Sequence, residues 1–299
     1  MDQAGMLRRK AREWEKSGGM STAPGEKKRR NPVRVIAVTS GKGGVGKTNI
    51  AANLAYLLAM RGKRVLLLDA DAGLANIDVI LGITPQYNLC HVLRGEKALS
   101  EVVVRGPGGI MIVPAASGVR EMAELSRGHK LTLLEELDQF DEDVDIMIID
   151  TAAGINGNVM YFNMAAHDII VVLSPDPTSL TDAYALIKVL NRDYNIRDFM
   201  IMANLVRSSG EAASVFNRLA AAVERFLNLT VKYVGYVSYD KLVAEAVRQQ
   251  SLFTEIFPSA RASRLLAIMA ETLCGDHGPR EDQSGMLKFF GSAVITGND

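Results

Sequence analysis

A glycine-rich stretch near the N-terminal end of the chain has residue types and spacing that bind phosphate. A β-branched run ending at Val38 precedes it and an Ala- and Leu-rich segment from Ile50 follows it, which predicts a strand, a loop and a helix in that order. In such a loop the backbone N–H groups face a phosphate, Lys47 reaches the β- and γ-phosphates, and the Thr48 hydroxyl binds Mg²⁺. The predicted nucleotide-binding residues are Gly41, Lys42, Gly43, Gly44, Val45, Gly46, Lys47, Thr48 and Asn49.

Three aspartates at the ends of apolar runs can complete this site. Asp69 and Asp71 follow Val65–Leu68, and Asp150 follows Ile146–Ile149. A carboxylate that follows a buried strand can bind Mg²⁺ directly or through water. Capping of the next helix is the alternative, but it explains one of Asp69 and Asp71 more easily than both. We therefore predict that carboxylates contribute to a magnesium site beside the loop.

Short β-rich runs alternate with helical patterns over residues 33–274, which predicts an α/β domain with a doubly wound, mostly parallel sheet and helices on both faces. Ligands of such sheets bind at the carboxyl ends of the strands, where the glycine loop and the aspartates fall. The predicted strands are Val33–Thr39, Arg64–Asp69, Ile110–Pro114, Asp145–Asp150, Asp168–Leu173, Phe199–Ala203 and Val231–Val237. The clearest predicted helices are Thr178–Asn191, Gly210–Leu227 and Pro258–Leu273.

Two tails of different composition flank this predicted domain. Residues 1–32 form a basic arm interrupted by Gly and Pro, and residues 275–299 begin as a Gly-, Asp- and Pro-containing linker. The net charge of the chain is zero. Residues 1–30 hold nine Lys and Arg against four Asp and Glu, so the arm carries +5 and the remainder −5. An acidic core argues against nonspecific DNA binding through the folded domain.

The cysteines and the hydropathy pattern exclude other classes of protein. Cys90 and Cys274 lie far apart without a C-x-x-C motif, which argues against a disulfide scaffold, a zinc site or an iron–sulfur cluster. No apolar run approaches the roughly 20 residues of a membrane span, and the N-terminus has no signal-peptide core. We therefore expect a cytoplasmic protein.

The earlier lysine of the loop, Lys42, is not needed in an ordinary P-loop. The motif K-G-G-V-G-K-T, with D-x-D at Asp69 and Asp71, resembles the deviant Walker A ATPases of the ParA/MinD family. The resemblance implies that Lys42 crosses a homodimer interface to the phosphates bound by the partner subunit; a solvated loop lysine is the alternative. It also implies that Asp71 positions the attacking water, that Asp69 supports the magnesium network and that Asp150 is the switch-II acid. We expect a Mg²⁺-dependent ATP hydrolase, activated by dimerisation, with Lys42, Lys47 and Asp71 as catalytic residues.

The segment after the predicted strand Phe199–Ala203 bears on the identity of the base. A GTPase carries N-K-x-D at such a place, whereas residues 204–207 read N-L-V-R. Asn204 resembles the adenine-contacting Asn of the family, and an amide can donate and accept at an adenine edge. The alternative is an Asn that closes a turn at the strand end. We predict that the nucleotide is ATP.

Residues 2–8 read D-Q-A-G-M-L-R. This segment resembles the D-Q-A-x-x-L-R activator motif of the FlhG family, also called YlxH or FleN, MinD-like ATPases that control flagellar number and placement. The matching residues are Asp2, Gln3, Ala4, Leu7 and Arg8. In that family the motif stimulates FlhF, a GTPase of the signal-recognition-particle type. Leu7, Ala11 and Trp14 recur at helical spacing, which suits a helix docked into a partner's groove. An arm that binds anions without selectivity, or that assists membrane binding, is the alternative.

An apolar patch near the C-terminus resembles the membrane-targeting sequence of MinD. Its members are Met286, Leu287, Lys288, Phe289 and Phe290. On a helix the four apolar side chains share one side, with Lys288 opposite, so the segment can lie in a bilayer interface. One copy should bind weakly, and the two copies of an ATP-bound dimer more strongly. Docking into a groove of its own domain is the alternative, and both can hold in different nucleotide states.

Together the resemblances imply an ATP-bound homodimer, peripheral on the inner face of the cell membrane, that regulates flagella. The implied partners are an FlhF-type GTPase, flagellar switch (C-ring) proteins and membrane lipids. The alternatives are a ParA-type DNA segregation ATPase, a MinD-like regulator of the division site, and a scaffold that binds ATP without useful turnover. The acidic core disfavours DNA, and the intact lysines and aspartates disfavour a scaffold.

Overall fold

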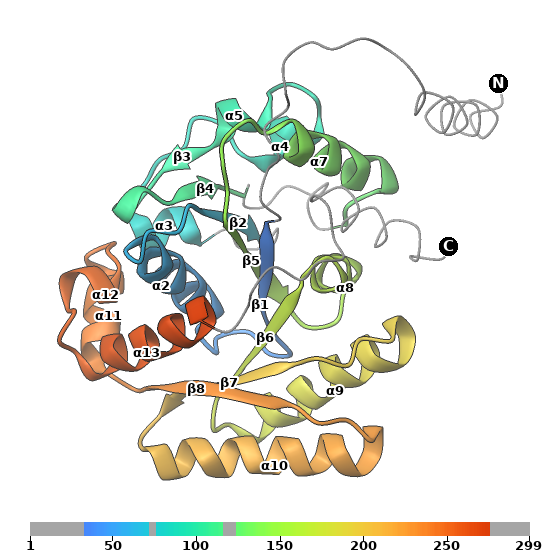
Figure 1. The fold of residues 1–299 in the computed structure, drawn as a ribbon, viewed down its shortest axis with the longest axis vertical. Helices are drawn as coiled ribbons and strands as arrows, with labels where there is room; N and C mark the ends of the chain where they lie inside the picture. Colours follow the sequence, from blue (N-terminus) through green and yellow to red (C-terminus); the bar gives the residue numbers. More distant parts are fainter. Residues whose placement is uncertain (1–32, 72–75, 116–123, 276–299) are drawn as a thin grey trace. The chain divides into compact units, whose positions relative to one another are not determined.

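Eight strands form one sheet in the computed structural model, which describes residues 33–71, 76–115 and 124–275 (Figure 1). Their order is β3-β4-β2-β5-β1-β6-β7-β8, and every neighbouring pair is parallel except β3 with β4. The chain leaves the interior strand β1 first to one side and later to the other, as in a doubly wound sheet. The strands are β1 (Arg34–Ser40), β2 (Val65–Ala70), β3 (Val104–Arg105), β4 (Met111–Val113), β5 (Ile146–Ala153), β6 (Asp168–Leu173), β7 (Met200–Val206) and β8 (Lys232–Ser238).

Helices cover both faces of the sheet because successive residues of a strand point to opposite sides. Ile36 of β1 packs with α2, α12 and α13 on one face. Its neighbour Val35 points to the other face. The helices α4, α5, α7 and α8 cover one part of that face, and α9 and α10 pack on the part formed by β6 and β7 (Figure 1). The described helices are α2 (Lys47–Ala59), α3 (Ile77–Leu81), α4 (Leu89–Leu93), α5 (Leu99–Val102), η1 (Pro107–Gly109), α7 (Arg127–Gln139), α8 (Gly157–Met164), α9 (Pro177–Tyr194), α10 (Ser209–Leu227), α11 (Lys241–Arg248), α12 (Phe253–Ile256) and α13 (Arg261–Gly275).

The central strands are buried on both sides, which explains their nearly continuous runs of Val, Ile, Leu and Met. Parallel register brings the carboxyl ends of β1, β2 and β5 to one edge of the sheet. In that register Asp69 of β2 pairs with Asp150 of β5. The fold therefore gathers residues from distant parts of the chain where the glycine loop begins.

The predicted α/β fold is confirmed, although several element boundaries differ from the expected ones, among them the ends of β5 and β7 and the start of the last helix. β7 continues past Ala203 to Val206, so Asn204 lies within the strand. The last helix begins at Arg261 and not at Pro258, because a turn closed by the bond from the Ala260 N–H to the Phe257 carbonyl comes first. The antiparallel strand β3 is only two residues long and was not predicted.

Candidate nucleotide-binding site

The glycine-rich loop joins β1 to α2, and two of its glycines are required by their surroundings. At Gly41 a Cβ atom would stand 2.1 Å from the carbonyl carbon of Asp182 in α9. Gly46 has a φ of 89° and would place a Cβ atom 2.5 Å from the side-chain nitrogen of Asn204. A residue with a side chain cannot follow this path without displacing its neighbours. The loop conformation is therefore fixed by contacts with α9 and β7.

Lys47 and Thr48 are the first two residues of α2. Lys47 is only 6% exposed. The N–H groups of the first helical turn and this ammonium concentrate positive charge at one place, which favours a bound anion. The arrangement matches the predicted phosphate cradle.

Asp69 and Asp150 form a buried pair, each 1% exposed. Asp69 accepts hydrogen bonds from the backbone N–H groups of Asp71 at 3.1 Å and Ile77 at 3.4 Å. No hydrogen bond of normal geometry reaches either carboxylate oxygen of Asp150 among the described residues, although the Thr48 hydroxyl lies close enough to lower its pKa. A buried carboxylate without a partner is costly. The site is thus suited to a cation or a donor that arrives with the ligand.

The pair also holds protons more tightly than ordinary carboxyl groups. Burial, and next the charge of Asp150, raise the pKa of Asp69 well above its usual range. Burial raises the pKa of Asp150 to about 7, although the nearby Lys47 ammonium and Thr48 hydroxyl act in the opposite direction. Two neighbouring carboxylates in a low-dielectric interior ionise together only with difficulty unless a cation is added.

This donor set fits Mg²⁺ shared with a nucleotide. Among residues 33–71, 76–115 and 124–275 there is no group of three or more His, Cys, Asp or Glu side chains that could hold a metal by itself. Mg²⁺ takes oxygen ligands, keeps several waters, and commonly binds through one or two carboxylates plus substrate phosphates. Thr48, Asp69 and Asp150 are the residues that would hold it.

Asp71 lies at the same edge, one residue beyond β2, and is half-buried. Its charge adds to the rise in the pKa of both Asp69 and Asp150, so the three carboxylates are close enough to interact. The structure therefore brings together the three aspartates that the sequence singles out.

Lys42 is bound within its own chain. Its Nζ donates to a carboxylate oxygen of Asp176 at 2.6 Å and to the hydroxyl of Thr178. Asp176 is the N-cap of α9 and also accepts from the Thr178 backbone N–H at 2.9 Å. The bond from Lys42, followed by those from Thr178, lowers the pKa of Asp176 to about 2. Neither partner of Lys42 was predicted from the sequence. The D-P-T sequence at the start of α9 indicates a helix cap, but it does not indicate a contact with a residue 134 positions away.

Asn204 is buried against the P-loop. Its Nδ2 donates to the Val45 carbonyl oxygen at 2.8 Å, and the residue is 5% exposed. The predicted adenine contact stays a prediction, but the amide stands beside the loop from which a bound nucleotide would extend. A second role, bracing the loop, was not predicted.

Comparisons with known proteins agree with this geometry. Residues 33–199 match the model of a family described as an AAA domain. The antiactivator FleN of Pseudomonas aeruginosa is 45% identical over 265 residues, which cover 89% of this chain and 94% of that protein. The flagellum site-determining protein YlxH of Helicobacter pylori is 37% identical, with coverage of 86% and 88%. The chain belongs to the FleN/YlxH family of MinD-like ATPases.

A solved structure shares the fold of this MinD-like ATPase. The septum site-determining protein MinD of Pyrococcus horikoshii, complexed with Mg-ADP, superposes with a TM-score of 0.68 at 22% identity. The match covers 81% of this chain and 96% of that one. It supports the doubly wound P-loop architecture derived above.

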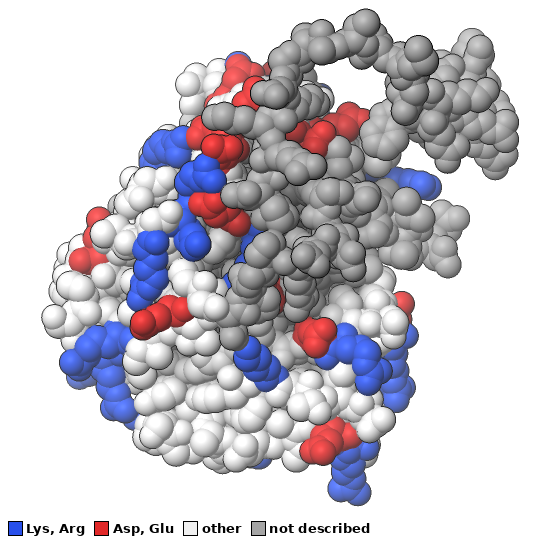
Figure 2. Space-filling view, viewed as in Figure 1, with Lys and Arg blue, Asp and Glu red and all other residues white. Residues whose placement is uncertain are grey.

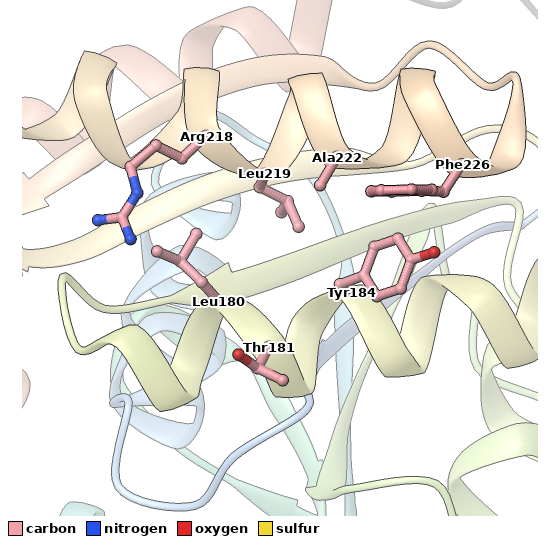
Figure 3. A pocket seen from close by; sticks show the side chains of 7 residues that line it. All are labelled: Leu180, Thr181, Tyr184, Arg218, Leu219, Ala222 and Phe226. Carbon is pink, nitrogen blue, oxygen red and sulfur yellow. The ribbon is translucent and has the colours of Figure 1, made fainter.

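Apart from the nucleotide site, this MinD-like ATPase has a groove between α9 and α10 (Figure 3). Tyr184 and Phe226 meet edge to face, with ring centroids 6.4 Å apart, and Phe226 is 59% exposed. The Arg225 guanidinium lies over the Phe226 ring at 5.3 Å. The groove is lined by Leu180, Thr181, Tyr184, Arg218, Leu219, Ala222 and Phe226.

The two terminal motifs of this FleN/YlxH-family chain lie outside the described residues. They are the activator residues Asp2, Gln3, Ala4, Leu7 and Arg8, and the membrane residues Met286, Leu287, Lys288, Phe289 and Phe290. Their predicted roles therefore stay predictions. No helix in the described part of the chain is both long and apolar enough to cross a bilayer.

Proposed function

We propose that the chain regulates the number and placement of flagella as an ATP-switched homodimer on the membrane. The observation that carries this proposal is the 45% identity to the antiactivator FleN, which covers 94% of that protein. It is supported by a P-loop that keeps both lysines and by the aspartates gathered beside it. ATP binding assembles the dimer, and hydrolysis takes it apart.

In this proposal the residues of the pocket divide the work of phosphoryl transfer to water. Lys47 and the α2 N-terminus bind the β- and γ-phosphates, and Asp71 orients the attacking water. Bound Mg²⁺ supplies neutralising charge at the phosphate oxygens. Lys42 of each subunit enters the pocket of the other, so a monomer is a slow hydrolase.

Size measurement in the presence of ATP tests this division. Gel filtration with light scattering should show that Asp71→Ala binds ATP and accumulates as a dimer, since only the water-orienting carboxylate is lost. Lys47→Ala should lose ATP binding and stay monomeric. An Asp71→Ala protein that never dimerises in ATP would overturn the proposed switch.

We place the active form at the inner face of the cell membrane through residues 286–290. The transfer free energy of four apolar side chains is at most about 6–10 kcal/mol before ordering costs, so one copy binds weakly and two copies gain by avidity. Sedimentation with anionic liposomes should recover the full chain in ATP but not in ADP. A chain ending at residue 275 should remain in the supernatant in both nucleotides. Equal sedimentation of both chains in ATP would contradict the assignment.

We assign the N-terminal motif to stimulation of an FlhF-type GTPase. Gln3→Ala should lower the stimulated GTP turnover of that partner and leave the ATP turnover of this chain unchanged. Met6→Ala, a change between the matched motif positions, serves as the control. Equal stimulation by wild type and Gln3→Ala would refute a role for this side chain.

The α9–α10 groove is our candidate surface for a flagellar switch protein. The guanidinium group of Arg225 lies over its exposed Phe226 ring, and Arg218 lines the opposite end of the groove. Aromatic and Arg side chains dominate binding free energy at protein interfaces. These charges favour a partner segment that carries both apolar and acidic side chains. Phe226→Ala should weaken binding of switch proteins at least about tenfold. Ile268→Ala, which removes a 60% exposed apolar side chain from α13, should not.

DNA segregation is the second candidate function, and the distribution of charge on the surface does not favour it. On the face seen in Figure 2, Lys and Arg are interspersed with Asp and Glu and form no large single-sign area. A steeply salt-dependent affinity for nonspecific DNA in the presence of ATP would reverse this preference.

A further inference from the structure

The end of β1 is hydrogen-bonded to the segment that follows Asp150 in β5. The Thr151 hydroxyl donates to the Val38 carbonyl at 3.2 Å, and the Gly154 N–H donates to the Ser40 carbonyl at 2.9 Å. Between Val38 and Ser40 the register of β1 with β5 shifts. The strand that leads into the P-loop is thus tied to the residues that come directly after the magnesium-site carboxylate.

Ser40 is the last residue of β1, and its side chain reaches into the P-loop. Its hydroxyl donates to the Lys42 carbonyl at 2.7 Å, and the residue is 0% exposed. A carbonyl oxygen can only accept, so the hydroxyl proton must lie between the two groups. Because polar groups in the interior need a partner, this bond fixes the direction of the peptide group that follows Lys42.

The loop on the other side of Lys42 is exposed. A Cβ atom added at Gly43 or Gly44 would meet nothing within 4 Å among the described residues. The loop therefore has room to move there, and the Lys42 side chain itself is 37% exposed. The buried bond from Ser40 is thus well placed to set the direction in which Lys42 leaves the domain.

We propose that Ser40 is a positioning residue for Lys42. Its hydroxyl orients the backbone from which the Lys42 side chain enters the pocket of the partner subunit. Its carbonyl, which accepts from Gly154, holds the same backbone against the segment that follows Asp150. This inference rests on the proposed function, because it requires that Lys42 acts across a homodimer.

ATP turnover and ATP affinity of the full-length chain give the first test. Ser40→Ala should lower turnover about fivefold, the effect of one lost hydrogen bond, and leave ATP affinity unchanged within about twofold. Ser263→Ala is the matched control, because Ser263 is 3% exposed and its hydroxyl donates to the Phe257 carbonyl at 2.7 Å. This control should turn over ATP as wild type does. Wild-type turnover in Ser40→Ala would overturn the proposal.

Subunit mixing gives a readout that a merely structural defect would not change. In a mixed dimer of Ser40→Ala with Asp71→Ala, the first subunit keeps Asp71 and receives Lys42 from a partner with an intact Ser40. An equimolar mixture should therefore hydrolyse ATP faster than the same total amount of Ser40→Ala alone. A mixture that runs at half the rate of Ser40→Ala alone would show that Ser40 acts within its own pocket, and would overturn the proposal.

A mixture of Lys42→Ala with Asp71→Ala separates this proposal from the proposed function. If that mixture recovers activity while the mixture with Ser40→Ala runs at the half rate, only the positioning role of Ser40 is refuted. If the mixture with Lys42→Ala stays inactive, the donation of Lys42 to the partner is itself refuted.

Discussion

The ammonium of Lys42 lies 2.6 Å from the carboxylate of Asp176, the residue that caps helix α9 of the same chain. Lys42 is the residue that the family resemblance assigns to the partner's pocket. Both side chains are partly exposed, at 37% and 45%, so the contact can open without unfolding the domain. In the proposed dimer, Asp176 and Thr178 would therefore compete with the partner's phosphates for this cation.

Removal of the charge at Asp176 should favour dimerisation. Asp176→Asn keeps a good N-cap, because Asn caps helices as well as Asp does, but it weakens the hold on Lys42. Exposed ion pairs shift equilibria only a few-fold, so half-maximal dimerisation should need up to about fivefold less ATP. Analytical ultracentrifugation across an ATP titration measures this. Asp143→Asn, which disrupts the exposed pair of Asp143 with Arg64, is the matched control, and an identical shift in both variants would argue against the competition.

Gly41→Ala should disrupt the site and Gly43→Ala should not, although both change the same loop. A Cβ atom at Gly41 would collide with the backbone of α9, whereas one at Gly43 would meet nothing within 4 Å. Overpacking against a rigid backbone costs about 1–3 kcal/mol or more, so Gly41→Ala should lower the free energy of unfolding by at least that amount. Urea denaturation of the two variants checks the difference. Equal free energies of unfolding would mean that the backbone of α9 moves to accommodate the added Cβ atom.

Nucleotide-free protein should become less stable as the pH rises from about 4 to 7. The pKa values of Asp69 and Asp150 are raised on folding, the latter to about 7, so the folded state binds more protons than the unfolded state over this interval. The free energy of unfolding therefore falls with increasing pH. Thermal denaturation at pH 5 and pH 8 in a chelator should show the trend, and ATP with Mg²⁺ should restore more stability at pH 8.

Asp150→Asn should remove much of this pH dependence. The amide keeps the shape of the carboxyl group but cannot ionise, so the nucleotide-free variant should be more stable than wild type at pH 8, by roughly 1–3 kcal/mol. Its ATP turnover should fall because a magnesium ligand is lost. A variant that is less stable than wild type at pH 8 would show that the charged carboxylate has a donor in the folded chain.

The sequence predicted those parts of the site that are contiguous or that end an apolar run. The P-loop is one short segment with fixed spacing, and the strand pattern of β2 and β5 predicts where Asp69 and Asp150 end up. Contacts between distant segments could not be predicted, because no local pattern records them. The bond of Lys42 to Asp176, the approach of Gly41 to Asp182 and the brace from Asn204 all depend on how α9 and β7 pack against the loop.

The predicted boundaries of helices and strands were wrong where the local sequence has only a weak preference for one conformation. β3 is only two residues long and forms by pairing with β4, so the sequence has no alternation of apolar and polar residues that would predict it. Leu205 takes a left-handed conformation that its side chain disfavours, at the place where the β7–β8 pairing shifts register.

In the proposed mechanism each subunit donates Lys42 to the pocket of its partner, and subunit mixing tests this directly. Lys42→Ala and Asp71→Ala should each hydrolyse ATP poorly on their own. An equimolar mixture should recover up to about a quarter of the wild-type rate, because half of randomly formed dimers are mixed and each of these has one complete pocket. A mixture that stays as inactive as the separate variants would show that Lys42 acts only within its own chain.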